Sequence, residues 1–306
     1  MTKDSYPSHP LRLIVGASAG SAAAILARAF VPALAAELRQ PLNIEFHQGE
    51  NNESGAALLT QSAPDGYTIL MTTLGVLAIR PNLHPETRAA AGSELTPVAL
   101  VARCPLLLAV HPSVPAQSVD ELTRYARAHP GELTFAASAI GGAPHVAAEL
   151  YMSMTGVDMR LACYQSTHKL FDDLKAGRLS LTFNNIMSML EPLAKGEFRG
   201  LAVTSAKRSA AVPALPTMDE TGLAGYEITN WLGIVAPPRT APPLVATLNS
   251  AIIAALNSDE VTRNLTACGM QAAGSSAAEF TRYIHSELER WAPIVKACAA
   301  RKAEFR

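Results

Sequence analysis

The sequence has little net charge and few aromatic residues, and both scarcities exclude classes of partner. Its 306 residues carry a formal net charge of −1, without a long run of either sign. Such a balance argues against a nucleic-acid surface and against a polybasic membrane patch. Phe, Trp and Tyr make up only 6% of the chain, too few for a platform that stacks single-stranded bases. We therefore expect no nucleic-acid partner.

Metal and nucleotide motifs are also missing. The eight histidines show no H-x-x-x-H spacing and the four cysteines no C-x-x-C, so we expect no metal ion. Neither G-x-x-x-x-G-K-[ST] nor G-x-G-x-x-G occurs, and we expect no cofactor. We expect the cysteines to be small buried residues. Cys268 and Cys298 are the first pair to test for a disulfide.

No apolar stretch is long enough for a membrane-spanning helix, which needs roughly 18 residues. The longest candidate, 22–38, is interrupted by Arg28, Pro32 and Glu37. The first ten residues are polar and do not resemble a secretory signal. Two interpretations stay open: the protein remains inside the cell, or a signal has been removed from it.

Short apolar runs alternate along the chain with longer helical patterns, which predicts an α/β fold with parallel sheets. The length fits two lobes, and 49% apolar residues can fill a large core. We place lobe 1 at 1–103 plus 228–306 and lobe 2 at 104–227. The expected strands are 11–15, 42–46, 67–71, 95–101, 106–110, 133–137, 179–183, 201–204 and an extended segment 226–235. The main expected helices are 22–38, one that begins at Ser118, 144–154, 170–176, 186–194 and 277–300.

Four of the expected strands end in small hydrogen-bonding residues, and several lead directly into a helix. The carboxyl ends of strands are where ligands bind in open α/β sheets. A helix N-terminus there offers unpaired N–H groups and a partial positive charge, so an anion can bind without a cationic side chain. We therefore expect facing cradles in the two lobes for a small organic acid. The four groups are Ser18, Gly20 and Ser21; Thr72 and Thr73; Ser138, Gly141 and Gly142; and Asn184 with Asn185.

No acid, base and nucleophile stand out as a catalytic set, so we assign no catalytic residue. His145 lies in the first turn of an expected helix, where it could donate to a ligand or could pack and cap the turn. Glu149, one turn later, is expected to be a surface charge. A cleft without catalytic groups is that of a binding protein.

Several segments, in order along nearly the whole chain, resemble the Bug (TctC-like) solute-binding receptors of tripartite tricarboxylate transporters. The most specific are Ala63-Pro64-Asp65-Gly66-Tyr67-Thr68, Leu95-Thr96-Pro97-Val98-Ala99, His111-Pro112-Ser113-Val114-Pro115, His145 with Glu149-Leu150, and 201–208.

This resemblance implies a periplasmic-binding-protein type II-like fold, in which two α/β lobes enclose a ligand cleft. It implies a carboxylate ligand, membrane components of a tripartite tricarboxylate transporter as partners, and a periplasmic location. We also expect a monomer. The loops 16–21 and 72–75 would hold the carboxylate, and 138–142 with Asn184 would select the rest of the ligand. The family's Phe-Asp-Asn strand end is here Phe183-Asn184-Asn185, which argues against an amino-acid ligand because an ammonium group needs an anion.

Two alternatives to a transport receptor remain. An enzyme on the same fold would have to use Cys163, His145 or Tyr164, the only candidate groups we can name. A relative inside the cell could instead act as a metabolite sensor, and it would need a protein partner because no helix-turn-helix segment is evident.

Overall fold

The computed structural model describes residues 6–17, 21–47, 53–83, 95–137, 140–164 and 166–304, with side chains to Lys296. The chain divides into two compact units. Unit 1 comprises residues 1–103, 231–267 and 271–296; unit 2 comprises 104–230, 268–270 and 297–306. Two strands, β4 (Thr96–Val110) and β9 (Thr229–Ala236), pass from one unit into the other.

The sheet of unit 1 has a parallel core with antiparallel strands added beside it. Its first three strands are β1 (Leu11–Val15), β2 (Leu42–Phe46) and β3 (Thr68–Thr73). β1 lies between β2 and β3 and is parallel to both. β9 then pairs with β3 in the antiparallel sense, and β4 follows in the strand order. The expected parallel pairing is present among β1, β2 and β3, but the antiparallel pairing of β9 was not expected; a strand that arrives from the other unit can pair in either sense.

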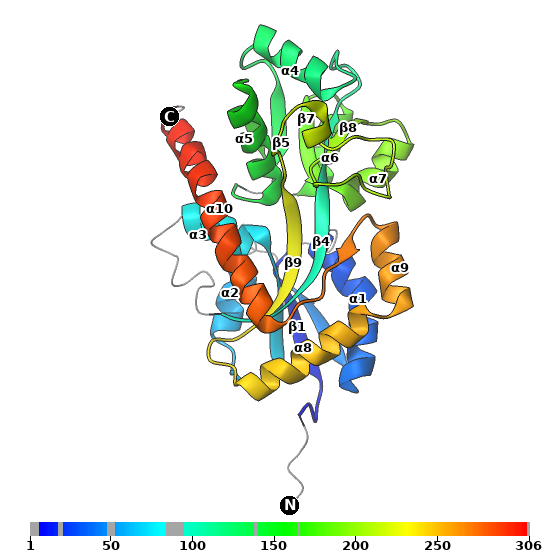
Figure 1. Cartoon of the computed structure of the whole chain (residues 1–306), viewed down its shortest axis with the longest axis vertical. Coiled ribbons are helices and arrows are strands. Elements are labelled where there is room, and N and C mark those ends of the chain that lie inside the picture. Colours follow the sequence, from blue (N-terminus) through cyan, green and yellow to red (C-terminus); the bar gives the residue numbers. More distant parts are fainter. Residues whose placement is uncertain are drawn as a thin grey trace, which may run out of the picture. The chain divides into compact units, whose positions relative to one another are not determined.

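The helices of unit 1 bury apolar faces against this sheet and against each other. The longest are α1 (Ala22–Leu38), α8 (Pro242–Leu256), α9 (Asp259–Ala267) and α10 (Ala277–Glu304). α1 packs against α8 and α9, as Figure 1 shows. α1 begins at Ser21, whose side chain accepts a hydrogen bond from the Ala24 N–H at 3.2 Å; this N-cap fixes where the helix starts. The shorter elements are α2 (Glu53–Thr60), a π-helical turn η2 (Gly75–Ile79), α3 (Arg80–Leu83) and β10 (Gln271–Ala272).

In unit 2, β4 pairs antiparallel with both β7 (Leu181–Asn185) and β8 (Arg199–Val203). β5 (Thr134–Ala137) is parallel to β7 and to β6 (Arg160–Cys163). The helices are α4 (Val119–Ala128), α5 (Ala143–Thr155), α6 (Thr167–Lys175), α7 (Ile186–Ala194) and the 3-10 turn η4 (Asp219–Thr221). The predicted cap of α4 is confirmed, because Ser118 Oγ accepts from the Glu121 N–H at 3.2 Å.

Three further expectations differ from the structure. The two strands expected on either side of Pro105 form one strand, β4, since a proline removes one donor without preventing extended backbone. β6 was not expected; its residues Arg160-Leu161-Ala162-Cys163 lack a clean apolar alternation. Thr72 and Thr73 are the last two residues of β3, and Asn184 and Asn185 are the last two residues of β7, whereas these pairs were expected to follow the strands.

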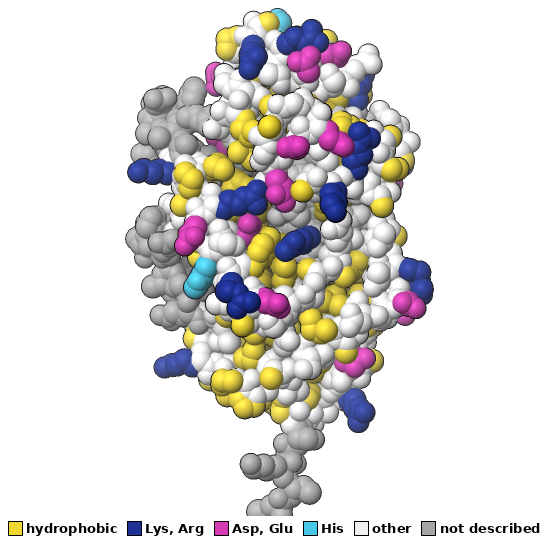
Figure 2. Space-filling view, viewed as in Figure 1, with side chains coloured by type: hydrophobic (Ala, Val, Ile, Leu, Met, Phe, Trp, Pro, Cys, Tyr) yellow, Lys and Arg dark blue, Asp and Glu magenta, His cyan; other side chains and the backbone are white. Residues whose placement is uncertain are grey.

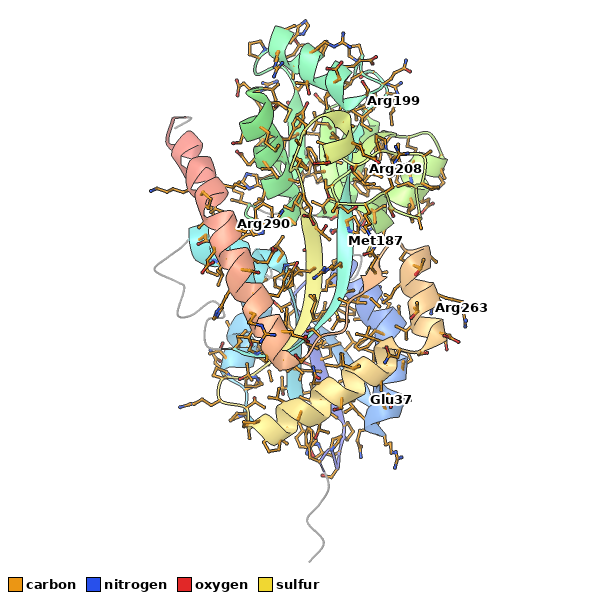
Figure 3. All side chains as sticks on the ribbon, viewed as in Figure 1. Glu37, Met187, Arg199, Arg208, Arg263 and Arg290 are labelled. Atoms are coloured by element: carbon orange, nitrogen blue, oxygen red, sulfur yellow. The ribbon has the colours of Figure 1, made fainter. Side chains whose placement is uncertain are left out.

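A buried carboxylate joins the two tryptophans of unit 1. Glu287 of α10 is 4% exposed, and its Oε2 accepts from the Nε1–H of Trp231 and of Trp291, each at 3.1 Å. Arg290, labelled on α10 in Figure 3, lies with Nη1 3.7 Å from Glu287 Oε1. Trp231 belongs to β9, so the carboxylate ties the long helix to the sheet.

The core of unit 2 contains two buried tyrosines around Phe183. The rings of Tyr151 and Tyr226 lie 6.1 and 6.4 Å from that of Phe183. Thr123 Oγ1 donates to Val119 O, so the Tyr151 hydroxyl must be the donor in its 2.8 Å bond to Thr123. Burial raises the pKa of Tyr151 to about 12 and that of Tyr226 well above its usual value.

We expect these phenols to make the protein sensitive to alkali. Folding favours their neutral forms, so their contribution is complete below pH 10, the unfolded pKa, and is lost as the pH rises toward about 12. The free energy of unfolding, measured by urea denaturation at several pH values, should fall in this window, and less steeply in Tyr151→Phe. A native protein whose tyrosines all ionise near pH 10 without loss of stability would contradict this.

The charges on the face shown in Figure 2 are mixed, and the described thiols differ in burial. On the face that Figure 2 shows, basic and acidic side chains are interspersed and no patch of one sign forms. Cys104 is buried, which raises the pKa of its thiol to about 12. The expectation of buried cysteines is wrong for Cys163, which is exposed, and for Cys268, which is half-buried. Both Cys104 and Cys268 are free of disulfides. The Cys298 side chain lies outside the described residues. None of the helices in the described part of the chain combines the length and apolar character needed to cross a bilayer.

Candidate functional site

In unit 1, the carboxyl ends of β1 and β3 lie side by side. The two strands are parallel, with Val15 opposite Met71, so the chain leaves both strands at the same edge of the sheet. β1 is followed by Gly16 and leads to the N-terminus of α1, and β3 leads into η2 at Gly75. The positive end of α1 therefore belongs to the same edge as the threonines that end β3.

A small cavity opens at this edge, and it contains a buried hydroxyl without a partner. Its volume is about 10 Å³, close to the smallest volume that can hold one water molecule. Thr72 is 2% exposed, and its Oγ1 has no hydrogen-bond partner among the described residues. A buried hydroxyl costs free energy unless it is paired, so a ligand atom or an ordered water is expected there. The lining residues are all uncharged: Gly16, Ala17, Ala23, Leu70, Met71, Thr72, Thr73 and Val76.

In unit 2, α5 begins at an N-cap residue that has no side chain to cap the helix. Its N-cap is Gly142, which makes no side-chain cap bond. The first backbone N–H groups of a helix have no partner within the helix; here Gly142, Ala143 and His145 supply them, while Pro144 has no N–H. Gly141, just before the cap, has φ +76°, a conformation that favours glycine.

His145 is buried and engaged within its own turn. It is 2% exposed, and its Nδ1 accepts from the Gly141 N–H at 3.2 Å. Its Nε2 lies 3.5 Å from Oε1 of Glu149, one helical turn later. Glu149 is only 7% exposed, so the expectation of a surface charge is wrong; the four-residue spacing from a histidine was the signal that could have shown it.

β7 places a second buried group without a partner close to α5. Asn184 is 3% exposed, and its Oδ1 accepts from the Asn185 N–H at 2.8 Å. The atom facing an N–H must be the carbonyl oxygen, so the amide orientation is fixed and Nδ2 is the free donor. Among the described residues, that Nδ2 has no hydrogen-bond partner. Since β5 and β7 are parallel neighbours, Asn184 lies at the same edge as the segment that leads to α5.

The side chain of Asn185, unlike that of Asn184, forms a hydrogen bond to another strand. Its Oδ1 accepts from Asn230 Nδ2 at 3.0 Å, at the start of β9. Asn230, 7% exposed, was not expected in the site, since its sequence neighbourhood carries no motif. This bond supports the end of β7 from the side.

The structure groups the expected site residues within each unit. In unit 1, Thr72 and Thr73 line one cavity, and Ser21 caps the helix that starts at its edge. In unit 2, Gly141, Gly142 and His145 form one turn, and Asn184 ends a strand at the same edge. Ser18, Gly20 and Ser138 lie outside the described residues, so their parts in the site stay predictions.

The loop after β1 also has a spacing that sequence reasoning overlooked. Residues 16–20 read Gly-Ala-Ser-Ala-Gly, which fits the G-x-S-x-G pattern of serine hydrolases between a strand and a helix. Such a serine needs a histidine base. His145, whose nitrogens face Gly141 and Glu149, is engaged elsewhere. Among the described residues, no three His, Cys, Asp or Glu side chains gather as metal ligands would.

The chain matches known proteins over almost its full length. Residues 26–299 match the family described as tripartite tricarboxylate transporter family receptor, TctC. Protein BugT of Bordetella pertussis (strain Tohama I) is 30% identical over 302 residues, which cover 98% of this chain and 93% of BugT.

Solved structures agree with this match. R. palustris Rpa4515 with adipate has a TM-score of 0.89 at 34% identity, covering 95% of this chain and 97% of that one. MatC of Rhodopseudomonas palustris with bound malate has a TM-score of 0.87 at 26% identity, covering 95% and 100%. The periplasmic binding protein BugD has 0.87 at 25%, covering 96% and 99%. The predicted fold class, α/β of the periplasmic-binding-protein kind, is confirmed. The chain belongs to the Bug/TctC family of solute-binding receptors.

Proposed function

We propose that this protein captures a small dicarboxylate with uncharged groups and delivers it to a tripartite tricarboxylate-type uptake system. One observation carries the proposal. Each unit holds, at the carboxyl end of a core strand, one buried polar side chain that no described residue satisfies: Thr72 Oγ1 in unit 1 and Asn184 Nδ2 in unit 2. Both lie beside helix N-termini, which favour anions.

The chemistry of the relatives' ligands fits these groups. Rpa4515 was solved with adipate and MatC with malate, and both molecules carry two carboxylates. A carboxylate oxygen accepts hydrogen bonds only, and the groups offered here are donors: N–H groups, a hydroxyl and an amide. No charge partner is required, because donors in a desolvated site bind an anion strongly.

Binding without catalysis follows from the same arrangement. The family consists of receptors, and the described histidine and tyrosine named as candidate catalysts have other partners. His145 faces Gly141 and Glu149, and the Tyr164 hydroxyl donates to Asp173 at 2.6 Å. We therefore assign the loop after β1, with its Gly16–Gly20 spacing, to ligand binding, and expect no hydrolysis of p-nitrophenyl acetate above the buffer rate.

The proposed function also implies a cellular location and partners for this protein. We place the protein in the periplasm, because its relative BugD is a periplasmic binding protein. We expect it to act as a monomer that docks on the membrane components of its transporter.

A thermal-shift screen tests the proposed ligand class. At a concentration of 100 times its dissociation constant, a bound ligand adds about 2.7 kcal/mol to the free energy of unfolding, which raises the melting temperature by several degrees. We expect malate or adipate to do so and dimethyl adipate, which has no charge, to have no effect. Equal shifts with the diacid and the diester, or none with any mono-, di- or tricarboxylate, would contradict the proposal.

A further inference from the structure

The two ring nitrogens of His145 have different neighbours, and this fixes the tautomer of the ring. Nδ1 accepts the Gly141 N–H at 3.2 Å, so it carries no hydrogen, and a neutral imidazole must then carry its proton on Nε2. That nitrogen lies 3.5 Å from the Glu149 carboxylate. Nε2 makes no hydrogen bond to a described residue, but the nearby negative charge still favours this tautomer, because it attracts the N–H dipole and would repel a bare lone pair.

The ring has little freedom to leave this position. It is 2% exposed and stacks on Phe135 of β5, with 6.3 Å between centroids and 14° between planes. Glu149 lies on the same face of α5 because the two residues are four apart. The imidazole therefore connects three parts of unit 2: the strand β5, the helix α5 and the glycine turn that joins them.

The glycine turn is the part that needs this support. Gly141 has φ +76° and precedes the uncapped N-cap Gly142, so no side chain of its own limits the backbone. Glycine pairs are conformationally free, and a loose turn would have to be ordered each time a ligand binds. Ordering a turn in advance lowers that cost and raises affinity.

We propose that His145, held by Glu149, is a positioning residue that orders the Gly141–Gly142 turn, so that the first N–H groups of α5 are fixed in the geometry that receives a carboxylate. The ring itself does not touch the ligand. This inference rests on the proposed function, since it assigns the purpose of the turn to ligand binding.

Two substitutions of His145 distinguish the effect of its hydrogen-bond acceptor from the effect of its side-chain volume. In His145→Asn, the carbonyl oxygen stands on Cγ as Nδ1 does and can accept the Gly141 N–H. His145→Leu fills the space without an acceptor. We expect the dissociation constant for malate and for adipate, measured by calorimetry, to rise about 10-fold or more in His145→Leu and to stay within about 3-fold in His145→Asn. Equal losses in both variants would overturn the proposal.

Measurements without ligand keep this inference separable from the proposed function. Nitrogen NMR of the wild-type protein should show His145 protonated on Nε2 and bare at Nδ1; the opposite tautomer would overturn the proposal even if the leucine variant does not fold. The Gly141 amide should exchange slowly in the wild type and in His145→Asn and at least about 10-fold faster in His145→Leu. If these hold but no carboxylate binds the wild type, the turn is ordered as inferred and the proposed function is wrong.

Discussion

Asn184→Asp is expected to weaken the binding of malate and adipate about 100-fold. The substitution replaces the buried donor Nδ2, which no described residue satisfies, by a carboxylate oxygen of nearly the same size. A hydrogen bond to a charged group contributes about 1.5–3 kcal/mol, and a negative charge beside the ligand's carboxylate adds repulsion. Calorimetric titration of the variant, after its folded state has been checked by circular dichroism, measures the loss.

Asn264→Asp is the matched control. It makes the same chemical change and the same change in net charge at an exposed position of α9, where no ligand contact is proposed, and affinity should stay within about 2-fold. If both variants weaken binding equally, the effect comes from net charge alone. If neither does, Asn184 does not contact the ligand.

Glu287→Leu is expected to lower the free energy of unfolding by about 4 kcal/mol. The carboxylate accepts both indole N–H groups, and an indole nitrogen has no other way to be satisfied when buried. Each donor left without an acceptor costs about 1–3 kcal/mol. Urea denaturation followed by tryptophan fluorescence measures the change directly, because the chain has only these 2 tryptophans.

Two further variants show whether the hydrogen bonds cause this loss. Glu287→Gln keeps an oxygen that can accept from an indole, so the loss should be about half as large. Glu289→Leu, on the exposed side of the same helix, should change stability by less than about 0.5 kcal/mol. A glutamine variant as unstable as the leucine variant would contradict the account.

Much of the fold could be predicted from local sequence because many helices and strands begin and end at characteristic capping or turn residues. β2 and α7 begin and end at the expected residues, Leu42–Phe46 and Ile186–Ala194. Ser118 begins α4, and the αL residue Gly156 ends α5. Each of these signals acts within a few residues: a cap accepts orphan N–H groups, and a glycine relieves the left-handed turn at a helix end.

The remaining features depend on partners far away in the chain. β4 is one strand of 15 residues because antiparallel neighbours in unit 2 supply hydrogen bonds to its second half, and local propensity around Pro105 cannot reveal them. Glu149 is an exception, because the histidine that it faces is only four residues away; it was missed because a glutamate on a helix usually points to solvent. The lobe boundaries stay a prediction.

The type of residue that forms the candidate site could be predicted from the sequence, but the residues that support it could not. Small polar residues at strand ends pointed to Thr72 and Asn184, and each has a buried atom, Oγ1 and Nδ2 respectively, without a hydrogen-bond partner among the described residues. The supporting group Asn230 was missed because its role arises only when a neighbouring strand comes close. Resemblance to the receptor family supplied the ligand class, which no single residue type specifies.

An NMR titration of the nitrogen-labelled protein with malate tests the central claim most directly. If the dicarboxylate binds to the proposed donors, the backbone amide signals of Thr73, Gly75 and Gly142 and the signal of the Asn184 side chain shift as malate is added, with a saturating dependence on its concentration. Signals of these four groups that do not move at any malate concentration would contradict the account.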